Sequence, residues 1–443
     1  MKAIVLGGVA AGMSAASKLK REKPDAEVVV YERGGFLSYG ACGFPYYISG
    51  LNPDPGKLIA RTCEQYEKMG IQTHLQHEAV QVDARMKRVQ VKNLESGQLF
   101  WDSYDVLMIG VGCESVVPKV EGAQLPSVFY VKSMEDALLF ERIVRLKGAD
   151  NVLIVGGGFI GVEMAEAMLR LGKQVTLIEA GERILSTFEP EFSELAAQEL
   201  EKKGVRLRLK EKVNLFSEQK DYREVRTDAE TYRADVVLVA VGVVPATEFL
   251  ADTGLEMARN GALVVDREQR TNLPDIFAAG DCAVCWHRVA EENYFIPMGT
   301  VANKCGRIAG GNMAGKHEQF EGALGTTAIQ VCDLEMFRTG LTEAEAKRKE
   351  INYAVKMVTS SDHPGYYPNP TRLFIKLLYE KRTLRLLGAN IAGEKGAVLR
   401  GDIFSTAIHA GMTTAELGTV DLAYAPPFAM VWDAVHVAAN ASK

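Results

Sequence analysis

The sequence lacks both an excess of basic residues and any long apolar run, and each absence excludes a class of partner. Its 443 residues carry 51 Lys and Arg against 57 Asp and Glu, which gives a formal net charge of −6. A protein that binds nucleic acid normally presents a basic face, so we expect no nucleic-acid partner. No window reaches the roughly 18 apolar residues that a membrane-spanning helix needs. We therefore expect no membrane span and a cytoplasmic protein.

Cysteine is also scarce and irregularly spaced. The chain has seven cysteines, and this odd number argues against a disulfide scaffold. In a reducing compartment most of them should be buried thiols. Cys282 and Cys285 form the only C-x-x-C pattern, which we interpret as incidental rather than as a redox pair or a metal clip. We expect no metal site.

What the sequence does contain is a dinucleotide-binding pattern at its start, with a strand over 3–6, a glycine turn over 7–12, a helix over 13–21 and a strand over 27–32. Glu32 follows Gly12 by 20 residues, the spacing at which a carboxylate reaches the ribose of a bound dinucleotide. Val9 replaces the usual second glycine, so a purely structural turn is the alternative. The apolar start also resembles an export signal, but its glycines and the helix pattern that follows favour a buried first strand.

A second copy of the pattern begins 149 residues later, with a strand over 151–155, a complete G-x-G-x-x-G fingerprint over 156–161, a helix over 162–171 and a strand over 174–178. Glu179 ends this unit 18 residues after Gly161. Its charge favours NADH because it would repel the 2′-phosphate of NADPH, although Arg183 could soften that preference. Two such folds in a chain too long for one core predict two dinucleotides and two or three domains.

A lone cysteine follows the first of these folds. Cys42 lies ten residues after Glu32 in the segment 38–46 (SYGACGFPY). Gly43 and Pro45 predict a turn into a short helix with Cys42 near its N-terminus, where the helix dipole would lower the pKa of the thiol. A buried core cysteine is the alternative. No second cysteine follows within six residues, so a dithiol mechanism is disfavoured, and a lone thiol would cycle through a mixed disulfide, a persulfide or a sulfenic acid.

The segment 271–281 (TNLPDIFAAGD) resembles the second flavin-binding motif of flavoprotein reductases with two dinucleotide folds. This resemblance implies that Asp281 holds the ribityl and phosphate region of FAD, and that the nicotinamide fold interrupts the FAD fold. We expect an α/β protein with two Rossmann-like dinucleotide-binding domains, for FAD and NAD(P)H, and an α+β C-terminal dimerisation domain. The expected domains are residues 1–113 with 243–322 for FAD, 114–242 for NAD(P)H and 323–443 for dimerisation.

The expected cofactors are FAD and NADH, with NADPH as the alternative nicotinamide cofactor. Their expected contacts lie in the glycine turns, at the strand-end carboxylates and where the chain crosses between domains. They are Gly7, Gly8, Ala10, Gly12, Glu32, Arg33, Ser38, Gly112, Gly156, Gly158, Phe159, Ile160, Gly161, Glu179, Gly242 and Asp281.

Over its whole length the sequence resembles the coenzyme A–disulfide reductase and NADH oxidase family. The resemblance rests on S-Y-x-x-C-G-x-P-Y around Cys42, both glycine fingerprints, the Asp281 segment, and the C-terminal segments 363–368 (HPGYYP) and 423–428 (AYAPPF). It implies a homodimer formed by the C-terminal domains, in which Tyr367 and Tyr424 reach a sulfur at Cys42 of the partner subunit. Interface packing is the alternative role of both tyrosines.

Two branches of this family differ near the cysteine. The oxidase and peroxidase branch carries a histidine in the first glycine turn, where this chain has Ala10, and this difference favours the disulfide-reductase branch. A family asparagine before the cysteine is Ala41 here, and a family lysine near the C-terminus is Trp432, so coenzyme A stays open as the substrate. The coenzyme A contacts that the resemblance implies are Ser14, Lys18, Arg21 and Ser38.

The sequence thus predicts an FAD-dependent enzyme that uses NAD(P)H to reduce a low-molecular-weight disulfide through Cys42, with Tyr367 and Tyr424 assisting. The acceptor is coenzyme A disulfide, or a persulfide or polysulfide. One alternative is an NADH oxidase that reduces oxygen to peroxide or water. The other is a flavin reductase that passes electrons to a protein acceptor and does not need Cys42.

Overall fold

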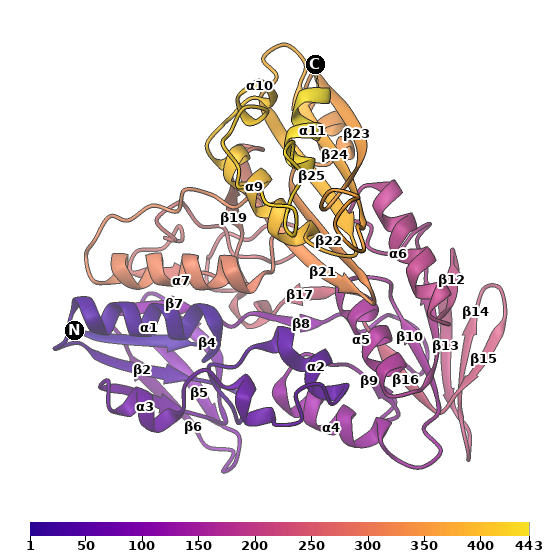
Figure 1. Ribbon diagram of the computed structural model, residues 1–443. Helices are drawn as coiled ribbons and strands as arrows, with labels where there is room; N and C mark the ends of the chain where they lie inside the picture. The colour runs from indigo at the N-terminus through magenta and orange to yellow at the C-terminus, as the bar shows by residue number, and fades with distance from the viewer. Residues whose placement is uncertain (443) are drawn as a thin grey trace.

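The computed structural model describes residues 1–442 and has three parts. In Figure 1 the first part is indigo and orange, the second is magenta, and the third runs from orange to yellow. The first part is a parallel sheet in the order β18-β7-β1-β2-β3. These strands are β1 (Lys2–Leu6), β2 (Glu27–Tyr31), β3 (Ile71–His74), β7 (Val106–Ile109) and β18 (Ile276–Ala278). Strand β18 enters from far along the chain and pairs with β7, so the segment 271–281 completes the first fold.

Helices α1 (Ala10–Glu22) and α7 (Gly299–Met313) lie side by side over this sheet (Figure 1). Their close approach depends on two glycines of α7. A Cβ added to Gly306 would lie 2.3 Å from the Ala11 carbonyl oxygen, and one added to Gly310 would lie 2.2 Å from that of Ala15. The remaining elements of this part are 3-10 turns at Ala41–Gly43, Pro55–Leu58 and Glu248–Leu250, helices α2 (Phe44–Ile48) and α3 (Cys63–Glu67), and strands β4 (His77–Asp83), β5 (Arg88–Asn93), β6 (Leu99–Ser103), β19 (Cys285–His287) and β20 (Glu292–Tyr294).

The second part repeats the same design with a parallel sheet in the order β12-β11-β10-β16-β9. Two short strands, β8 (Cys113–Ser115) and β17 (Val243–Pro245), pair antiparallel where the chain enters and leaves this part. The strands of the second part are β9 (Val128–Phe129), β10 (Asn151–Val155), β11 (Gln174–Glu179), β12 (Arg206–Leu209), β13 (Val213–Glu218), β14 (Arg223–Thr227), β15 (Thr231–Ala234) and β16 (Val236–Val239). Its helices are α4 (Met134–Val144), α5 (Phe159–Arg170) and α6 (Pro190–Lys202).

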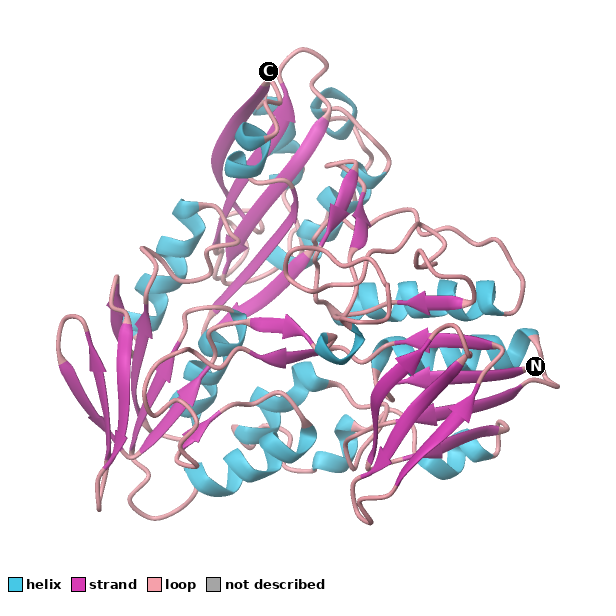
Figure 2. Cartoon of the chain, turned by 180° about the vertical axis from the view of Figure 1, so that it is seen from behind, coloured by secondary structure: helices cyan, strands magenta, loops and turns pink. Residues whose placement is uncertain are grey.

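The third part is an antiparallel sheet in the order β21-β22-β25-β24-β23 with helices packed on it, which Figure 2 shows from behind. The expected α/β architecture with an α+β C-terminal domain is therefore confirmed. The strands are β21 (Thr327–Val331), β22 (Leu334–Gly340), β23 (Tyr353–Ser361), β24 (Arg372–Glu380) and β25 (Leu386–Gly393), and the helices are α8 (Glu343–Arg348), α9 (Ala397–His409), α10 (Thr414–Leu417) and α11 (Ala434–Ala441).

Helices α1 and α5 begin three residues earlier than the sequence patterns predict, at Ala10 and Phe159 instead of residues 13 and 162. The last glycine of each fingerprint is therefore a helical residue and not part of the turn. This glycine sits where the helix crosses the preceding turn, and the close packing there is the reason for its identity. In residues 1–442 no helix is both long and apolar enough to cross a membrane.

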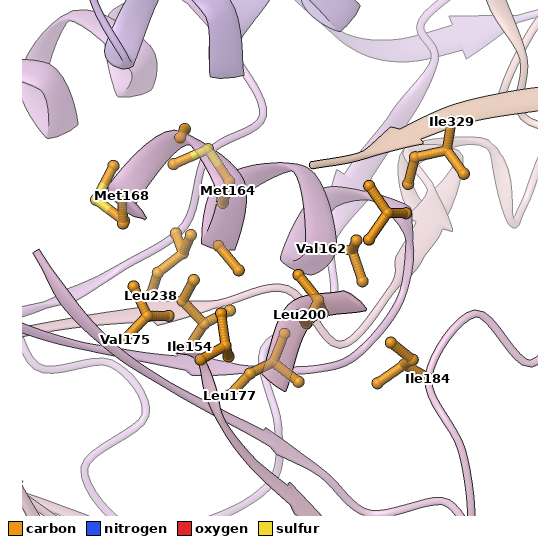
Figure 3. Packing of buried hydrophobic residues seen from close by; sticks show 14 of the residues in the cluster. Ile154, Val162, Met164, Met168, Val175, Leu177, Ile184, Leu200, Leu238 and Ile329 are labelled. Carbon is orange, nitrogen blue, oxygen red and sulfur yellow. The ribbon is translucent and has the colours of Figure 1, made fainter. Parts of the chain in front are cut away.

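A buried cluster around α5 joins the three parts. Val162 and Met168 of α5 pack with Ile154 and Leu177 of the second sheet, as Figure 3 shows. The same cluster includes Phe44 and Ile48 of α2, which follows Cys42, and Ile329 of the C-terminal sheet. This packing fixes α5 against both neighbours and so fixes the surroundings of Cys42.

A buried lysine provides a second link between the parts. Lys376 of β24 is 5% exposed and donates to Glu189 at 3.3 Å and to Glu191 at 2.9 Å, both at the start of α6. We expect Lys376→Met to lower the free energy of unfolding by about 3–5 kcal/mol, because it leaves Glu189 buried without a counter-charge. Urea unfolding measures the loss, and Lys356→Met on the exposed face of β23 is the control. Equal unfolding midpoints for the two variants would contradict this expectation.

Candidate active site

The two glycine turns share the same positive-φ backbone. Gly7 has a φ of +96° and Gly156 a φ of +110°, a region that glycine adopts without strain. A Cβ added to Gly12 or to Gly161 would lie 1.9 Å from the carbonyl oxygen of the first glycine of its own turn. The glycines are therefore required by the backbone itself in both folds.

The first turn lacks the second glycine of the fingerprint, and the second fold shows why a side chain is tolerated at that position. In the second fold that position is Gly158, whose φ is −76° and whose added Cβ would meet no protein atom within 4 Å. A side chain is therefore tolerated there, and Val9 occupies the equivalent place with a φ of −108°. The imperfect fingerprint leaves the geometry of the first turn intact.

Helices α1 and α5 start without a side-chain cap and without an acidic residue in the first turn. Other helices of the chain are capped, such as α4 by Ser133 and α8 by Thr342. The uncapped backbone N–H groups and the positive end of the helix dipole suit the pyrophosphate of a dinucleotide. Both helix starts therefore fit such a group.

A carboxylate stands at the same place in each fold. Glu32 accepts hydrogen bonds from the backbone N–H groups of Gly8 and Gly34, at 2.6 and 2.7 Å. Glu179 accepts the equivalent pair of bonds from its own turn, at 2.7 and 2.6 Å. Burial raises the pKa of Glu32. A carboxylate has about four acceptor sites, so each one keeps free sites for ribose hydroxyls.

The crossing segments meet beside Asp281. Gly112 has a φ of +73° and Gly242 a φ of +120°, and each is followed by one of the paired strands β8 and β17. The Cys113 thiol donates to the Asp281 carboxylate at 3.3 Å, and the Lys132 ammonium lies 3.7 Å from that carboxylate. Sequence reasoning missed Lys132, because it lies in an unremarkable loop before α4.

Cys42 lies in the 3-10 turn Ala41–Gly43, directly before α2, which agrees with the predicted turn into a short helix. Gly43 allows this turn to approach the chain at Leu58, because an added Cβ would lie 2.3 Å from the Leu58 Cδ2 atom. The Cys42 side chain is exposed. The alternative of a buried core cysteine is therefore wrong.

The protein groups around Cys42 do not by themselves lower its pKa as expected. The surrounding protein removes part of the water around the thiol, and this desolvation raises the pKa of Cys42, with Glu163 and Asp281 adding to the rise. The backbone and Lys132 act in the opposite direction but more weakly. Helix α2 spans only Phe44–Ile48, so only a weak helix dipole acts on the thiol.

Glu163 is another site residue that the sequence patterns did not single out, although it follows Gly161 by two residues. Burial, and then Glu166, raise the pKa of Glu163 to about 7. A cavity of about 10 Å³, enough for one water molecule, is lined by Tyr46, Glu163, Glu166 and Gln330, which come from all three parts of the chain. The α5 carboxylates thus form a polar pocket next to the cysteine segment.

We expect Glu163→Gln to lower the pKa of Cys42, because it removes a negative charge that disfavours the thiolate. The effect is present above pH 7, where Glu163 is ionised. The rate at which iodoacetamide alkylates Cys42 is measured as a function of pH. This pH profile should move to lower pH in Glu163→Gln. Glu194→Gln on the exposed side of α6 is the control, and an unmoved profile in Glu163→Gln would contradict the account.

The expected substrate residues on α1 are only partly available. Lys18 is 8% exposed and pairs with Glu22 at 2.7 Å and with Glu318 at 3.3 Å. Two carboxylates therefore occupy its ammonium. Ser14 donates a 2.8 Å hydrogen bond to Asn303, and Arg21 is exposed.

The other expected contacts lie around the same two turns. Ser38 donates its backbone N–H to Gly8 and places its hydroxyl 2.8 Å from that of Tyr66. Arg33 is exposed and forms an ion pair with Glu114 of β8. Ala10 and Phe159 are the first residues of α1 and α5, and Ile160, one residue further along α5, is exposed.

Within one subunit, Tyr424 pairs with Tyr366, the neighbour of the expected Tyr367. The Tyr424 hydroxyl lies 2.8 Å from that of Tyr366, whereas the Tyr367 ring packs edge-on against His363 at 5.3 Å. Tyr366 is 73% exposed and Tyr424 45% exposed. Tyr366 is therefore the partner of Tyr424, and the adjacent position of the two tyrosines in HPGYYP hid this from sequence reasoning.

The C-x-x-C cysteines lie inside the first part of the chain. Cys282 and Cys285 are buried and unpaired, and burial raises their pKa values to about 11 and about 12. The Cys282 thiol donates to the carbonyl oxygens of Ile109 and Ala279. Both cysteines are thus held as neutral thiols.

Together these features define a class of protein, an oxidoreductase built on two dinucleotide-binding folds with a thiol beside the first. Residues 1–303 match the family model described as pyridine nucleotide-disulphide oxidoreductase, and residues 326–434 match the dimerisation domain of that family. The chain belongs to the pyridine nucleotide-disulphide oxidoreductase family and is an NAD(P)H-dependent enzyme. The family resemblance and the enzyme class expected from the sequence are confirmed.

Several relatives match the chain over its full length. It is 37% identical over 444 residues to the NAD(P)H coenzyme A polysulfide/persulfide reductase of Pyrococcus horikoshii, covering 100% of this chain and 98% of that protein. It is 31% identical to an NADH oxidase of Enterococcus faecalis, covering 100% and 99%. The structure of a NAD-dependent persulfide reductase from A. fulgidus superposes with a TM-score of 0.95 at 34% identity, covering 99% of this chain and 82% of that one.

Proposed function

We propose that this protein uses NAD(P)H, through bound FAD, to reduce the sulfur–sulfur bond of a coenzyme A persulfide, a polysulfide or coenzyme A disulfide at Cys42. The observation that carries the proposal is the position of Cys42, an exposed thiol in the turn before α2, which packs against α5 of the second fold. Relatives whose names specify persulfide or polysulfide reduction support this acceptor class.

In the proposed reaction, FAD held by the first turn, Glu32 and Asp281 supplies a carrier that accepts a hydride and passes on an electron pair. The Cys42 thiolate attacks one sulfur of the acceptor, forms a new sulfur–sulfur bond and releases a thiolate. The electron pair from NAD(P)H then breaks that bond and restores the Cys42 thiolate. With a disulfide acceptor the balance is NAD(P)H, one proton and the disulfide giving NAD(P)⁺ and two thiols.

The C-terminal domain of this family is a dimerisation domain, and we propose that the chain acts as a homodimer. The Tyr366 and Tyr424 hydroxyls would then stabilise the thiolate released at Cys42 of the partner subunit. Ser14, Arg21 and Ser38 are the proposed contacts for the coenzyme A part of the acceptor. The cytoplasmic location stays a prediction.

The second fold is proposed to prefer NADH. The Glu179 carboxylate is held by two backbone N–H groups and cannot easily turn away from a 2′-phosphate. We expect Glu179→Ala to raise the ratio of kcat/KM for NADPH to that for NADH by about tenfold or more, corresponding to about 1.4 kcal/mol. Glu182→Ala, which removes an exposed carboxylate three residues away, is the control. An unchanged ratio in Glu179→Ala would refute this role.

The experiment that tests the proposed function is anaerobic. The purified enzyme is reduced with NADH and then mixed with coenzyme A persulfide, polysulfide, coenzyme A disulfide or oxygen, while the flavin absorbance is followed. We expect a sulfur–sulfur acceptor to reoxidise the enzyme fastest. Faster reoxidation by oxygen would favour the oxidase function, which one relative at 31% identity carries in its name.

A further inference from the structure

Arg400 of α9 lies at the base of the two loops that carry the tyrosine pair. The loops are residues 362–371, between β23 and β24, and residues 418–433, between α10 and α11. Arg400 itself is 9% exposed. A buried guanidinium needs a counter-charge and partners for its donors, and both are present here.

The partners of Arg400 come from both loops. Its Nη2 atom donates to the Asp362 carbonyl oxygen at 2.7 Å and to the Phe428 carbonyl oxygen at 3.0 Å. Its Nε atom donates to the two carboxylate oxygens of Asp433, at 3.1 and 2.9 Å. The Nη2 atom therefore joins the start of the first loop to the second loop. The counter-charge, Asp433, lies at the end of the second loop.

Each loop is also stiffened next to the arginine. In the first loop the Asp362 carboxylate accepts the backbone N–H groups of His363 and Thr371, at 3.0 and 2.7 Å. In the second loop Asp433 caps α11 by accepting the N–H of Val435 at 2.9 Å. Arg400 thus contacts the first loop at its start, and the second loop at Phe428 and at its end.

The tips of the same loops carry Tyr366 and Tyr424, whose hydroxyls lie 2.8 Å apart. An exposed tyrosine pair holds this geometry weakly by itself, because water competes for both hydroxyl groups. The relative position of the two hydroxyls therefore depends on how firmly the loop ends are joined. Arg400 joins them from inside the domain.

We propose that Arg400 is a positioning residue for the acceptor half of the reaction. It fixes the two loops of its own subunit, and through them the Tyr366 and Tyr424 hydroxyl pair that is presented to Cys42 of the partner subunit. This inference rests on the proposed function. It predicts that loss of Arg400 slows the step in which Cys42 reacts with the acceptor and leaves the step in which NADH reduces the enzyme unchanged.

Arg400→Lys is the most informative variant. Lysine keeps the positive charge facing Asp433, but a single ammonium cannot span Asp433 and both loop carbonyls with the planar geometry of a guanidinium. We expect kcat/KM for the sulfur–sulfur acceptor to fall by about tenfold to a hundredfold, as displaced groups in active sites do. Anaerobic reduction by NADH in a stopped-flow instrument should stay within about twofold of the wild-type rate.

A double-mutant cycle with Tyr424→Phe separates positioning from general damage. If Arg400 acts through the tyrosine pair, Tyr424→Phe slows the wild-type enzyme but has little further effect on Arg400→Lys. Arg372→Lys changes an exposed arginine that begins β24 directly after the first loop, and this matched control should leave both half-reactions unchanged. Light scattering and thermal unfolding verify that each variant is a folded dimer.

The outcomes distinguish this inference from the proposed function. A wild-type enzyme that reduces no sulfur–sulfur acceptor would refute the proposed function. A wild-type enzyme that does, with Arg400→Lys equally fast or with additive effects of the two substitutions, would refute the role of Arg400 alone. If Arg400→Lys does not fold, Asp433→Asn loosens Arg400 without removing it. A slower reaction with the acceptor and an unchanged reduction by NADH would then support the role of Arg400, and an unchanged reaction with the acceptor would refute it.

Discussion

Cys42→Ser is expected to abolish the reduction of sulfur–sulfur acceptors, lowering kcat by about a thousandfold or more, as loss of a nucleophile does. A serine hydroxyl forms no sulfur–sulfur bond and provides no thiolate for the electron pair to restore. Anaerobic NADH consumption with coenzyme A persulfide or coenzyme A disulfide measures the loss. Cys63→Ser, a half-buried thiol at the start of α3, is the control.

The same variant separates the three functions that the sequence left open. Under the proposed function, Cys42→Ser still accepts electrons from NADH but transfers none to sulfur. Oxygen uptake that continues in Cys42→Ser at the wild-type rate, together with faster reoxidation of wild-type enzyme by oxygen, would identify an oxidase. Full activity of Cys42→Ser with a reducible protein would identify a flavin reductase that serves a protein acceptor.

Gly161→Ala is expected to uncouple NADH from the flavin while FAD stays bound. The added Cβ would lie 1.9 Å from the Gly156 carbonyl oxygen, so the start of α5 has to move away from the turn. A displacement that costs about 3 kcal/mol raises KM for NADH about a hundredfold. The protein should stay yellow and be reduced normally by dithionite but slowly by NADH.

Gly158→Ala is the matched control for stability, because its Cβ meets no protein atom although it lies in the same turn. Its thermal unfolding should equal that of the wild type, whereas that of Gly161→Ala should be lower. Gly161→Ala with wild-type kinetics toward NADH would show that the second fold does not carry the nicotinamide cofactor.

The nucleotide folds could be predicted from the sequence because their determinants are local. Each turn needs glycine at fixed positions for its own backbone, and Glu32 and Glu179 follow those turns within one strand–helix–strand unit. The tolerance of Val9 and the earlier starts of α1 and α5 are small departures within the same local geometry.

The chemistry around Cys42 could not be predicted in the same way, because it depends on residues that are distant in the sequence. Desolvation, followed by Glu163 and Asp281, raises the pKa of Cys42 only after α5 and the segment after β18 are packed beside it. The Lys18 ammonium forms an ion pair with Glu318, which is 300 residues away in the sequence. Tyr366 pairs with Tyr424 across two loops whose relative position no local pattern encodes.

Cys42 is expected to store one electron pair in addition to the pair held by the flavin, and an anaerobic NADH titration counts both pairs. The enzyme is first oxidised with excess coenzyme A disulfide and freed of the excess, and NADH is then added while the flavin absorbance is followed. Full bleaching should take two equivalents of NADH per subunit in the wild type and one in Cys42→Ser. A single equivalent in the wild type would contradict this expectation.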